Sequence, residues 1–172
     1  MEITVTNIRS FDPSKGRGFY IGRSTSQYWR TLLPKGDQYD LKVGNPFSIG
    51  KDGDRDEVIA KYKSFLNARY TSVGAEHRQI LDYLAIAIII ADHNGAIGIA
   101  HDEEIPKPDL IHDHAIQLVC WCSPEPCHGQ VIKDYIEKSI AETYEHINKE
   151  EEGRVQRDFM HLWMKNPHGN HR

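Results

Sequence analysis

Apolar and polar residues alternate over the first eight positions of the chain. Ile3, Val5 and Ile8 are separated by polar residues, a pattern typical of a β-strand with one apolar, partly buried face. A turn-rich stretch follows, after which Phe19–Ile21 predicts a second short strand. Residues 27–43 scatter aromatic side chains among polar ones without a clear period, which indicates a loop or a short helix.

A loop dense in turn-forming residues, 44–55, leads into the first helical pattern. Apolar side chains recur at helical spacing after Asp56, and Asp54 is the expected N-cap of this helix. The apolar face consists of Val58, Ile59, Tyr62, Phe65 and Leu66. The sequence therefore predicts a loop that enters a helix N-terminus.

A second helix is predicted over Glu76–Ala91. Its last eight residues, Leu84–Ala91, are almost wholly apolar. Because a bilayer span needs roughly twenty such residues, this piece is expected in the core of the domain, and no membrane association is predicted. A buried strand over Ala85–Ala91 is the alternative, since a short apolar run does not reveal its own period.

The three cysteines lie in one stretch, Gln117–Gln130, between an apolar run and a third helical pattern. This arrangement predicts a strand, a tight loop shaped by two prolines, and a helix that begins near Gly129. A helix N-terminus attracts anions and lowers the pKa of a nearby thiol. Chemistry is therefore expected at Cys127 and His128.

The third helix is expected to run from Gly129 to Asn148 and to end in the acidic stretch 149–153. Apolar residues in the tail predict a partly helical C-terminal extension, 149–172, packed on the domain. Strands that alternate with helices favour one small Rossmann-like α/β domain over 1–148, with a mainly parallel sheet flanked by helices. A length of 172 residues suits one domain and is short for two.

A hydrophobic fraction of 39% with 27% charged residues is typical of a globular protein in water. The formal net charge of −4 gives no general attraction to nucleic acid or to anionic membranes, so any contact with nucleic acid has to be local. Three crowded cysteines do not resemble a secreted disulfide framework, and Met1–Thr6 lacks the features of a signal peptide. A cytoplasmic location is therefore expected.

Cationic and polar side chains follow the expected strand ends. Gly22 and Arg23 come directly after the second strand, and Asn45 and Arg55 lie in the loop before the first helix. Loops at the carboxyl ends of parallel strands share one crevice, so these residues are expected to meet the segment Cys122–Gly129. The arginines would bind anionic groups of a ligand, and Asn45 would form hydrogen bonds with a polar edge of that ligand. A single arginine on its own is more often a surface charge or a salt-bridge partner.

The cysteine cluster leaves three interpretations open. A structural zinc site would use Cys120, Cys122 and Cys127, although their spacing differs from the paired Cys-x2-Cys of the usual zinc knuckle. A reactive thiol at Cys127 would need His128 or a loop histidine as its base. Alternatively, the cysteines are small wall residues, while His128 and the helix N-terminal amides bind substrate. In a continuing strand, Cys120 and Cys122 would face one side and Trp121 the other.

Ten histidines give further candidate metal ligands. In an extended segment, His112 and His114 would face the same side and could share a metal or complete the zinc site. Two histidines with no third ligand in register are more often solvated loop residues. No metal or other cofactor is therefore expected, with zinc as the alternative.

Several blocks of the chain carry a family resemblance: Tyr20-Ile-Gly-Arg23, then Gly44-Asn-Pro-Phe47 with Ile49-Gly-Lys-Asp-Gly-Asp-Arg55, and last Cys120-Trp-Cys122-Ser-Pro124 with Cys127-His-Gly129. In this order, over about Ile3 to Ile140, the chain resembles the bacterial and phage family of domains of unknown function DUF4326. The last block is also similar to a second α/β family in which Cys-His-Arg starts a helix. Here Gly129 replaces that arginine, which removes an anion ligand. The resemblance implies little about activity and marks residues 70–114 as a long insertion.

These expectations converge on a pocket for a nucleotide, a nucleoside or a similar phosphorylated small molecule, used in hydrolysis or transfer at a glycosidic bond or in binding alone. His128 and Cys127 are the catalytic candidates, with His128 as acid, base or orienting group. The substrate-binding candidates are Gly22, Arg23, Asn45, Arg55, Cys122 and Gly129. No carboxylate stands out as a catalytic partner. The alternative is a zinc-stabilised module that binds a host protein or nucleic acid without catalysis, and the oligomeric state is left open.

Overall fold

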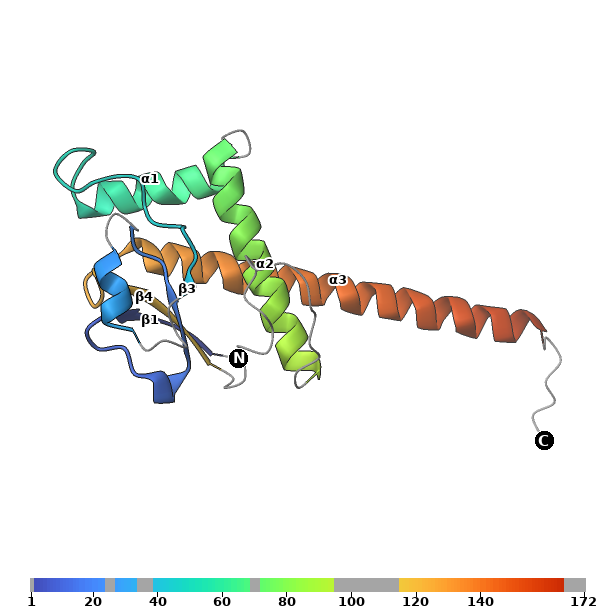
Figure 1. Cartoon of the computed structure of the whole chain (residues 1–172). Coiled ribbons are helices and arrows are strands. Elements are labelled where there is room, and N and C mark those ends of the chain that lie inside the picture. The colour runs from blue at the N-terminus through green and yellow to red at the C-terminus, as the bar shows by residue number, and fades with distance from the viewer. Residues whose placement is uncertain (1, 24–26, 34–38, 69–71, 95–114, 166–172) are drawn as a thin grey trace.

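Four parallel strands form one sheet, in the order β1-β4-β2-β3. The computed structural model describes residues 2–23, 27–33, 39–68, 72–94 and 115–165. Figure 1 shows its elements: strands β1 (Glu2–Asn7), β2 (Arg17–Tyr20), β3 (Tyr39–Asp40) and β4 (Ala115–Cys120), 3-10 helices η1 (Pro13–Lys15) and η2 (Gln27–Thr31), and α-helices α1 (Arg55–Asn67), α2 (Ser72–Asn94) and α3 (His128–Lys165).

The last strand in sequence, β4, lies in the middle of the sheet. It pairs in parallel with β1 on one side and with β2 on the other, and β3 extends the sheet beyond β2. Five consecutive residues of β4, from Ile116 to Cys120, are buried, as expected for a strand with neighbours on both sides. The expected small α/β fold with a parallel sheet is confirmed, and the carboxyl end of β4 opens at the centre of one sheet edge.

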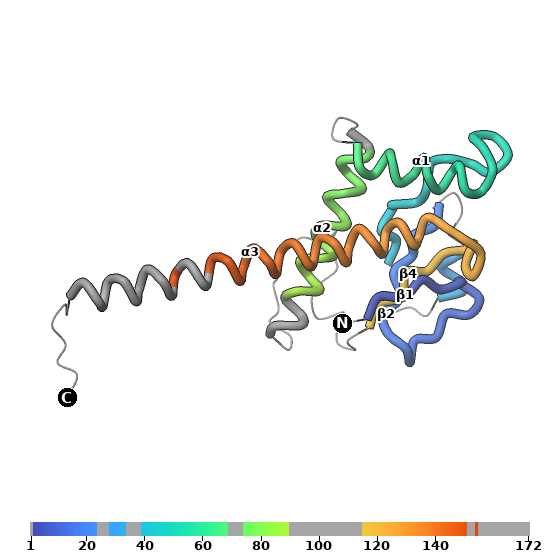
Figure 2. Tube along the Cα trace, turned by 180° about the vertical axis from the view of Figure 1, so that it is seen from behind, coloured from blue at the N-terminus to red at the C-terminus, as the bar shows by residue number. Residues whose placement is uncertain are grey.

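The two faces of the sheet bury different partners. Successive residues of a strand point to opposite faces, so Phe19 and Tyr20 of β2 enter different clusters. On one face the sheet packs with residues of all three α-helices, among them Tyr62, Leu84 and Ile132. On the other face it packs with Trp29 and Leu33, from η2 and the residues that follow it. Figure 2 shows that α3 runs alongside the sheet and crosses α2.

Helix α1 begins where the sequence predicts it. The carboxylate of Asp54 accepts a hydrogen bond from the backbone N–H of Glu57 at 2.9 Å, and the carboxylate of Glu57 accepts one from the N–H of Asp54 at 2.8 Å. This reciprocal pair is a capping box, which satisfies backbone donors that the first helical turn leaves free. Val58, Tyr62 and Leu66 of the predicted apolar face are buried.

Helix α2 confirms the helical interpretation of residues 76–91 and extends it at both ends. The alternative strand over Ala85–Ala91 is wrong, because these residues continue the helix. Leu81, Leu84, Ala85 and Ile88 are buried at a helical period of three to four, whereas Ile86 is 47% exposed. The apolar run therefore faces the core on one side only.

Helix α3 does not end in the acidic stretch 149–153, and that prediction is wrong. The helix continues to Lys165. Lysine and glutamate favour helices, and ion pairs four residues apart support α3: Lys138 with Glu142 and Lys149 with Glu145. The proposed boundary between 148 and 149 thus lies inside one continuous helix (Figure 1). The packing of residues 149–172 on the domain stays a prediction.

Residues 95–114, with His101, His112 and His114, lie outside the described residues, as does the tail from 166 to 172. The predictions that concern those histidines and the part of the insertion from 95 to 114 therefore stay predictions. In the part of the chain that the structure describes, none of the helices combines the length and the apolar character that crossing a membrane requires.

Candidate functional site

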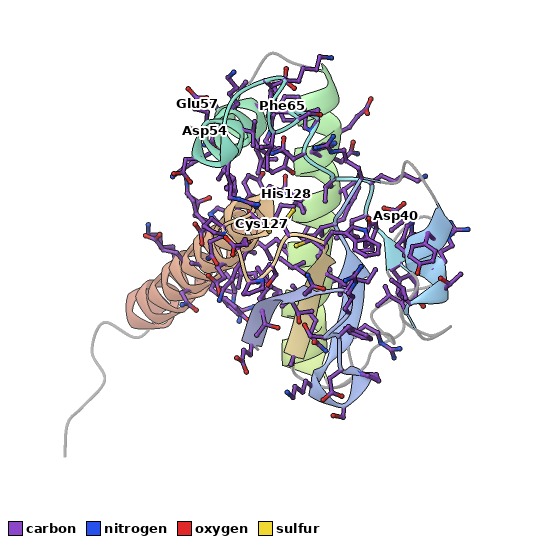
Figure 3. The ribbon with its side chains drawn as sticks, turned by 90° about the vertical axis from the view of Figure 1, so that its left-hand side faces the viewer. Asp40, Asp54, Glu57, Phe65, Cys127 and His128 are labelled. Carbon is purple, nitrogen blue, oxygen red and sulfur yellow. The ribbon has the colours of Figure 1, made fainter. Side chains whose placement is uncertain are left out.

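A cavity of about 360 Å³ lies at the carboxyl ends of β2 and β4. Its walls come from three separate parts of the chain: the residues after β2, the loop between β3 and α1 with the start of α1, and the loop between β4 and α3. Figure 3 shows Cys127 and His128 at the start of α3, with the N-terminal end of α1 above them. The crevice expected at the carboxyl edge of the parallel sheet is therefore present.

Seven of the eight candidate site residues line this cavity: Gly22, Arg23, Asn45, Arg55, Cys122, Cys127 and His128. Gly129 does not line it. A Cβ atom at Gly129 would lie 2.7 Å from Cγ1 of Val5 and 3.0 Å from Cδ1 of Ile21, so this glycine lets α3 pack closely on the sheet. The structure thus brings together residues up to about a hundred positions apart and gives Gly129 a packing role.

The two loops beside the cavity touch at their backbones. A Cβ atom at Gly44 would lie 2.8 Å from the carbonyl oxygen of Gly22 and 3.0 Å from Cα of Arg23. Backbone atoms cannot easily move away from such a contact, so position 44 requires a residue without a side chain. Gly44 therefore fixes how the loop that carries Asn45 meets the loop that carries Arg23.

Asn45 shapes its loop through both ends of its carboxamide. Its Nδ2 donates to the carbonyl of Val58 at 3.1 Å, and its Oδ1 accepts from the N–H of Phe47 at 2.9 Å. The side chain is 7% exposed. Asn45 thus ties the loop to α1. A hydrogen bond from its carboxamide to a ligand, as expected from the sequence, would have to compete with these two bonds.

The two arginines line the cavity from different parts of the chain and are held by uncharged groups. Arg23 donates from Nη1 to Oγ of Ser48 at 2.8 Å and from Nη2 to the carbonyl of Phe47 at 3.2 Å. Arg55 donates from Nη1 to the carbonyl of Pro126 at 3.2 Å. Among the described residues, neither arginine forms an ion pair with a carboxylate. The carboxylate of Glu57, two residues after Arg55, is hydrogen-bonded in the capping box. Their positive charges are therefore available at the cavity.

Cys127 caps α3 with its sulfur. Its Sγ lies 3.3 Å from Sγ of Cys120 and accepts from the N–H of Gly129 at 3.2 Å. The hydrogen bond from Cys120 and those from the backbone of Gly129 and Gln130 favour the thiolate and outweigh burial, so the pKa of Cys127 lies below its ordinary value. The first amides of α3 are thus partly used by this sulfur.

Cys122 has the opposite electrostatic setting. Its hydrogen bond to Cys120 favours the thiol form and burial adds to this effect, so the pKa of Cys122 is raised. The strand ends at Cys120, so the alternation of faces expected for a longer strand stops there, and Cys122 and Trp121 both line the cavity. The interactions among the three thiols thus favour the thiolate at Cys127 and the thiol form at Cys122.

His128 is a buried, neutral imidazole. It is 7% exposed, and burial is the main cause that lowers its pKa, so the ring carries no charge near pH 7. Its Nε2 lies 2.8 Å from the carbonyl oxygen of Ile21, which requires the proton to be on Nε2. Nδ1 therefore keeps a lone pair that can accept a proton or a hydrogen bond.

Sequence reasoning missed the apolar and aromatic part of the wall. Tyr20, Phe47, Ile49, Val58, Ile59 and Trp121 also line the cavity. Arg23 was selected because it follows the end of a strand. Trp121 follows the end of β4 in the same way, but the sequence did not show that this strand ends at Cys120. The cavity thus combines cationic groups with an apolar surface.

The described residues contain no group of three or more histidine, cysteine, aspartate or glutamate side chains arranged to hold a metal ion. The sulfur atoms of Cys120 and Cys127 lie 3.3 Å apart, and all three cysteines are free thiols. What this arrangement offers chemically is cationic hydrogen-bond donors, one thiol with a lowered pKa, and one neutral imidazole.

Comparisons with known proteins identify a family for this chain and no activity. A family model described as "Domain of unknown function (DUF4326)" matches residues 9–138, about three quarters of the chain. Comparison with curated proteins and with solved structures yields no match. The matched range contains every residue that lines the cavity.

Proposed function

Because the chain belongs to the DUF4326 family of domains of unknown function, its activity has to be inferred from the site itself, and we propose that the cavity binds a nucleotide or a similar phosphorylated small molecule. The ligand would lie at the carboxyl edge of the sheet, where open parallel sheets commonly bind such molecules. The volume of about 360 Å³ falls within the range of small-molecule sites.

The observation that carries this proposal is the pair of arginines. A guanidinium has five N–H donors. The bonds to described residues occupy two of them in Arg23 and one in Arg55, so both can still donate to a ligand. Charge-assisted bonds from arginine to phosphate are among the strongest hydrogen bonds in proteins. An anionic group is therefore the best partner for this wall.

Binding has more support than catalysis. Hydrolysis or transfer at a glycosidic bond usually employs a pair of carboxylates, and the described residues that line the cavity include neither aspartate nor glutamate. We therefore propose ligand binding as the activity. For any reaction in the cavity, Nδ1 of His128 would be the proton acceptor and Cys127 the nucleophile.

Isothermal titration calorimetry with ribose 5-phosphate and with AMP tests the proposal. We expect the wild-type protein to bind both phosphates, and R23Q/R55Q to lose binding by about a hundredfold or more, since each charged hydrogen bond contributes roughly 1.5–3 kcal/mol. The matched control is K138Q/K149Q, which removes the same charge from the exposed side of α3 and should bind as the wild type does.

Circular dichroism has to show that R23Q/R55Q is folded, because both arginines also hold loops. Equal affinity of R23Q/R55Q and the wild type, or no binding of either phosphate by the wild type, would show that the cavity is not the proposed phosphate site.

A further inference from the structure

Two exposed aromatic rings, Tyr28 and Trp121, lie side by side, and Trp121 is part of the cavity wall. Tyr28 is 61% exposed and Trp121 is 38% exposed. Their ring centroids are 6.1 Å apart and their planes are within 10° of parallel. Trp121 also lines the cavity that holds the two arginines. One small ligand could thus contact the arginines and Trp121 together.

Trp121 is held in place by two hydrogen bonds, one to its ring and one to its backbone. Its Nε1 donates to the hydroxyl of Tyr20 at 3.0 Å, and its backbone carbonyl accepts from Nδ2 of Asn7 at 2.9 Å. Tyr20 in turn stacks on Trp29, with centroids 4.5 Å apart. A ring fixed in this way loses little conformational entropy when a ligand stacks on it. Trp121 is therefore a preorganised platform.

A cation lies against the same indole. The guanidinium carbon of Arg9 is 5.9 Å from the centroid of the Trp121 ring, within the range of a cation–π interaction. With Arg23 and Arg55 in the cavity, the surroundings of Trp121 are positively charged at several points although the whole chain carries a net charge of −4. This local charge suits a ligand that is both aromatic and anionic.

We propose that Trp121 and Tyr28 form a clamp for the planar base of a nucleoside monophosphate whose phosphate is held by Arg23 and Arg55. The inference rests on the proposed function and narrows its ligand from phosphorylated small molecules to mononucleotides. A base between two rings needs about 7 Å, twice the ~3.5 Å contact distance of carbon atoms. The ring centroids are 6.1 Å apart, so the ring planes are closer than this, and the Tyr28 ring has to move away from Trp121 to admit the base.

The test compares AMP with ribose 5-phosphate, which carries the same phosphate and sugar but no base. Base stacking on an aromatic side chain predicts that the wild-type protein binds AMP at least about fivefold more tightly. In Tyr28→Leu this advantage should shrink about fivefold or more, while the affinity for ribose 5-phosphate stays within about twofold of the wild type. Tyr28→Phe keeps the ring and should retain the advantage.

A matched control is Tyr83→Leu, because Tyr83 is an exposed tyrosine, 42% accessible, on α2. This variant should bind both probes as the wild type does. Since Trp121 also bonds to Tyr20, the Tyr28 variant carries the test, and Trp121→Phe is used for fluorescence. AMP should quench tryptophan emission in the wild type, ribose 5-phosphate should not, and the quenching should be lost in Trp121→Phe.

The possible failures are distinguishable. If the wild-type protein binds ribose 5-phosphate and binds AMP no more tightly, the clamp is overturned while the phosphate site stands. If Tyr28→Leu keeps the full advantage for AMP and AMP leaves the emission unchanged, the clamp is likewise overturned. If neither probe binds, the proposed function fails and the clamp fails with it.

Discussion

The sulfur of Cys127 lies 3.3 Å from that of Cys120 and also accepts a hydrogen bond from a backbone N–H of α3. Such an arrangement stabilises a thiolate even though the side chain is only 7% exposed. Cys122 is more exposed, yet its pKa is raised because it donates to Cys120. At the scale of single residues, acidity and accessibility therefore favour different cysteines.

Alkylation by iodoacetamide near pH 7 separates these two influences. Only the thiolate reacts, and each unit of pKa changes its fraction about tenfold, so we expect Cys127 to be labelled before Cys122. In Cys120→Ala, which removes the hydrogen bond from Cys120, Cys127 should react more slowly. Peptide mapping by mass spectrometry gives the order, and earlier labelling of Cys122 would show that exposure dominates.

The candidate site could be predicted in part from single residues. The strand-end rule selected Arg23, because the carboxyl edge of a parallel sheet gathers its loops, and the turn-rich approach to a helix N-terminus selected Arg55. The hydrogen bonds of Asn45 could not be predicted, since its partner, the carbonyl of Val58, depends on how the loop wraps over α1. The place of Trp121 was missed because a pattern of alternation does not reveal where a strand ends.

Helix α1 depends on its capping box at the scale of the element. Replacing Asp54 by Ala removes the side-chain bond to the N–H of Glu57, and we expect the free energy of unfolding to fall by about 1 kcal/mol. The matched control is Asp56→Ala, an exposed acid in the same first turn, which should change stability by no more than about 0.5 kcal/mol. Urea denaturation measures both, and equal losses would show that the charge matters more than the cap.

Helix α2 presents a buried histidine to α1. His77 is 7% exposed, its ring lies against Tyr62 and Phe65, and its Nδ1 meets no hydrogen-bond partner among the described residues. Burial is the main cause that lowers the pKa of His77, and the pKa of His128 is lowered for the same reason. Both rings are therefore neutral in the folded protein at a pH where the unfolded chain begins to protonate them.

This difference predicts a loss of stability in acid. As the pH falls from about 7 to about 5, the unfolded state takes up protons near the ordinary pKa of 6.5, while the folded state takes them up at lower pH, so the free energy of unfolding decreases. In His77→Phe the decrease should be shallower, and stability at pH 7 should be retained or increased, because a buried unpaired nitrogen is removed. His146→Gln, an exposed site on α3, should keep the wild-type slope. A wild-type slope in His77→Phe would contradict the assignment.

The elements themselves follow from the sequence where the signal is local. The cap and the apolar face of α1 predict its start, and the buried residues Leu81, Leu84, Ala85 and Ile88 of α2 recur at helical spacing. The end of α3 was placed too early because the acidic stretch 149–153 was interpreted as a helix end. Such a stretch can continue a helix when basic residues are available to pair with acidic ones one turn away. Here Lys149 pairs with Glu145, and the helix continues.

At the scale of the whole molecule, the fold joins three distant segments around one cavity. The last strand in sequence inserts between the first two, so the loop after β4 lies beside the residues after β2. The loop before α1 closes the third side, and Arg55 ties it to the carbonyl of Pro126. The sequence indicated that these loops share an edge, but the pairing order of the strands, and with it which loops are neighbours, depends on long-range contacts that no local pattern contains.

A crystal structure of the protein with bound AMP tests most directly the central claim that Arg23 and Arg55 together hold the phosphate of a nucleotide. The account predicts phosphate oxygens within about 3 Å of a guanidinium nitrogen of each arginine, with the adenine ring between Trp121 and Tyr28. A phosphate bound with no contact to either arginine would contradict it.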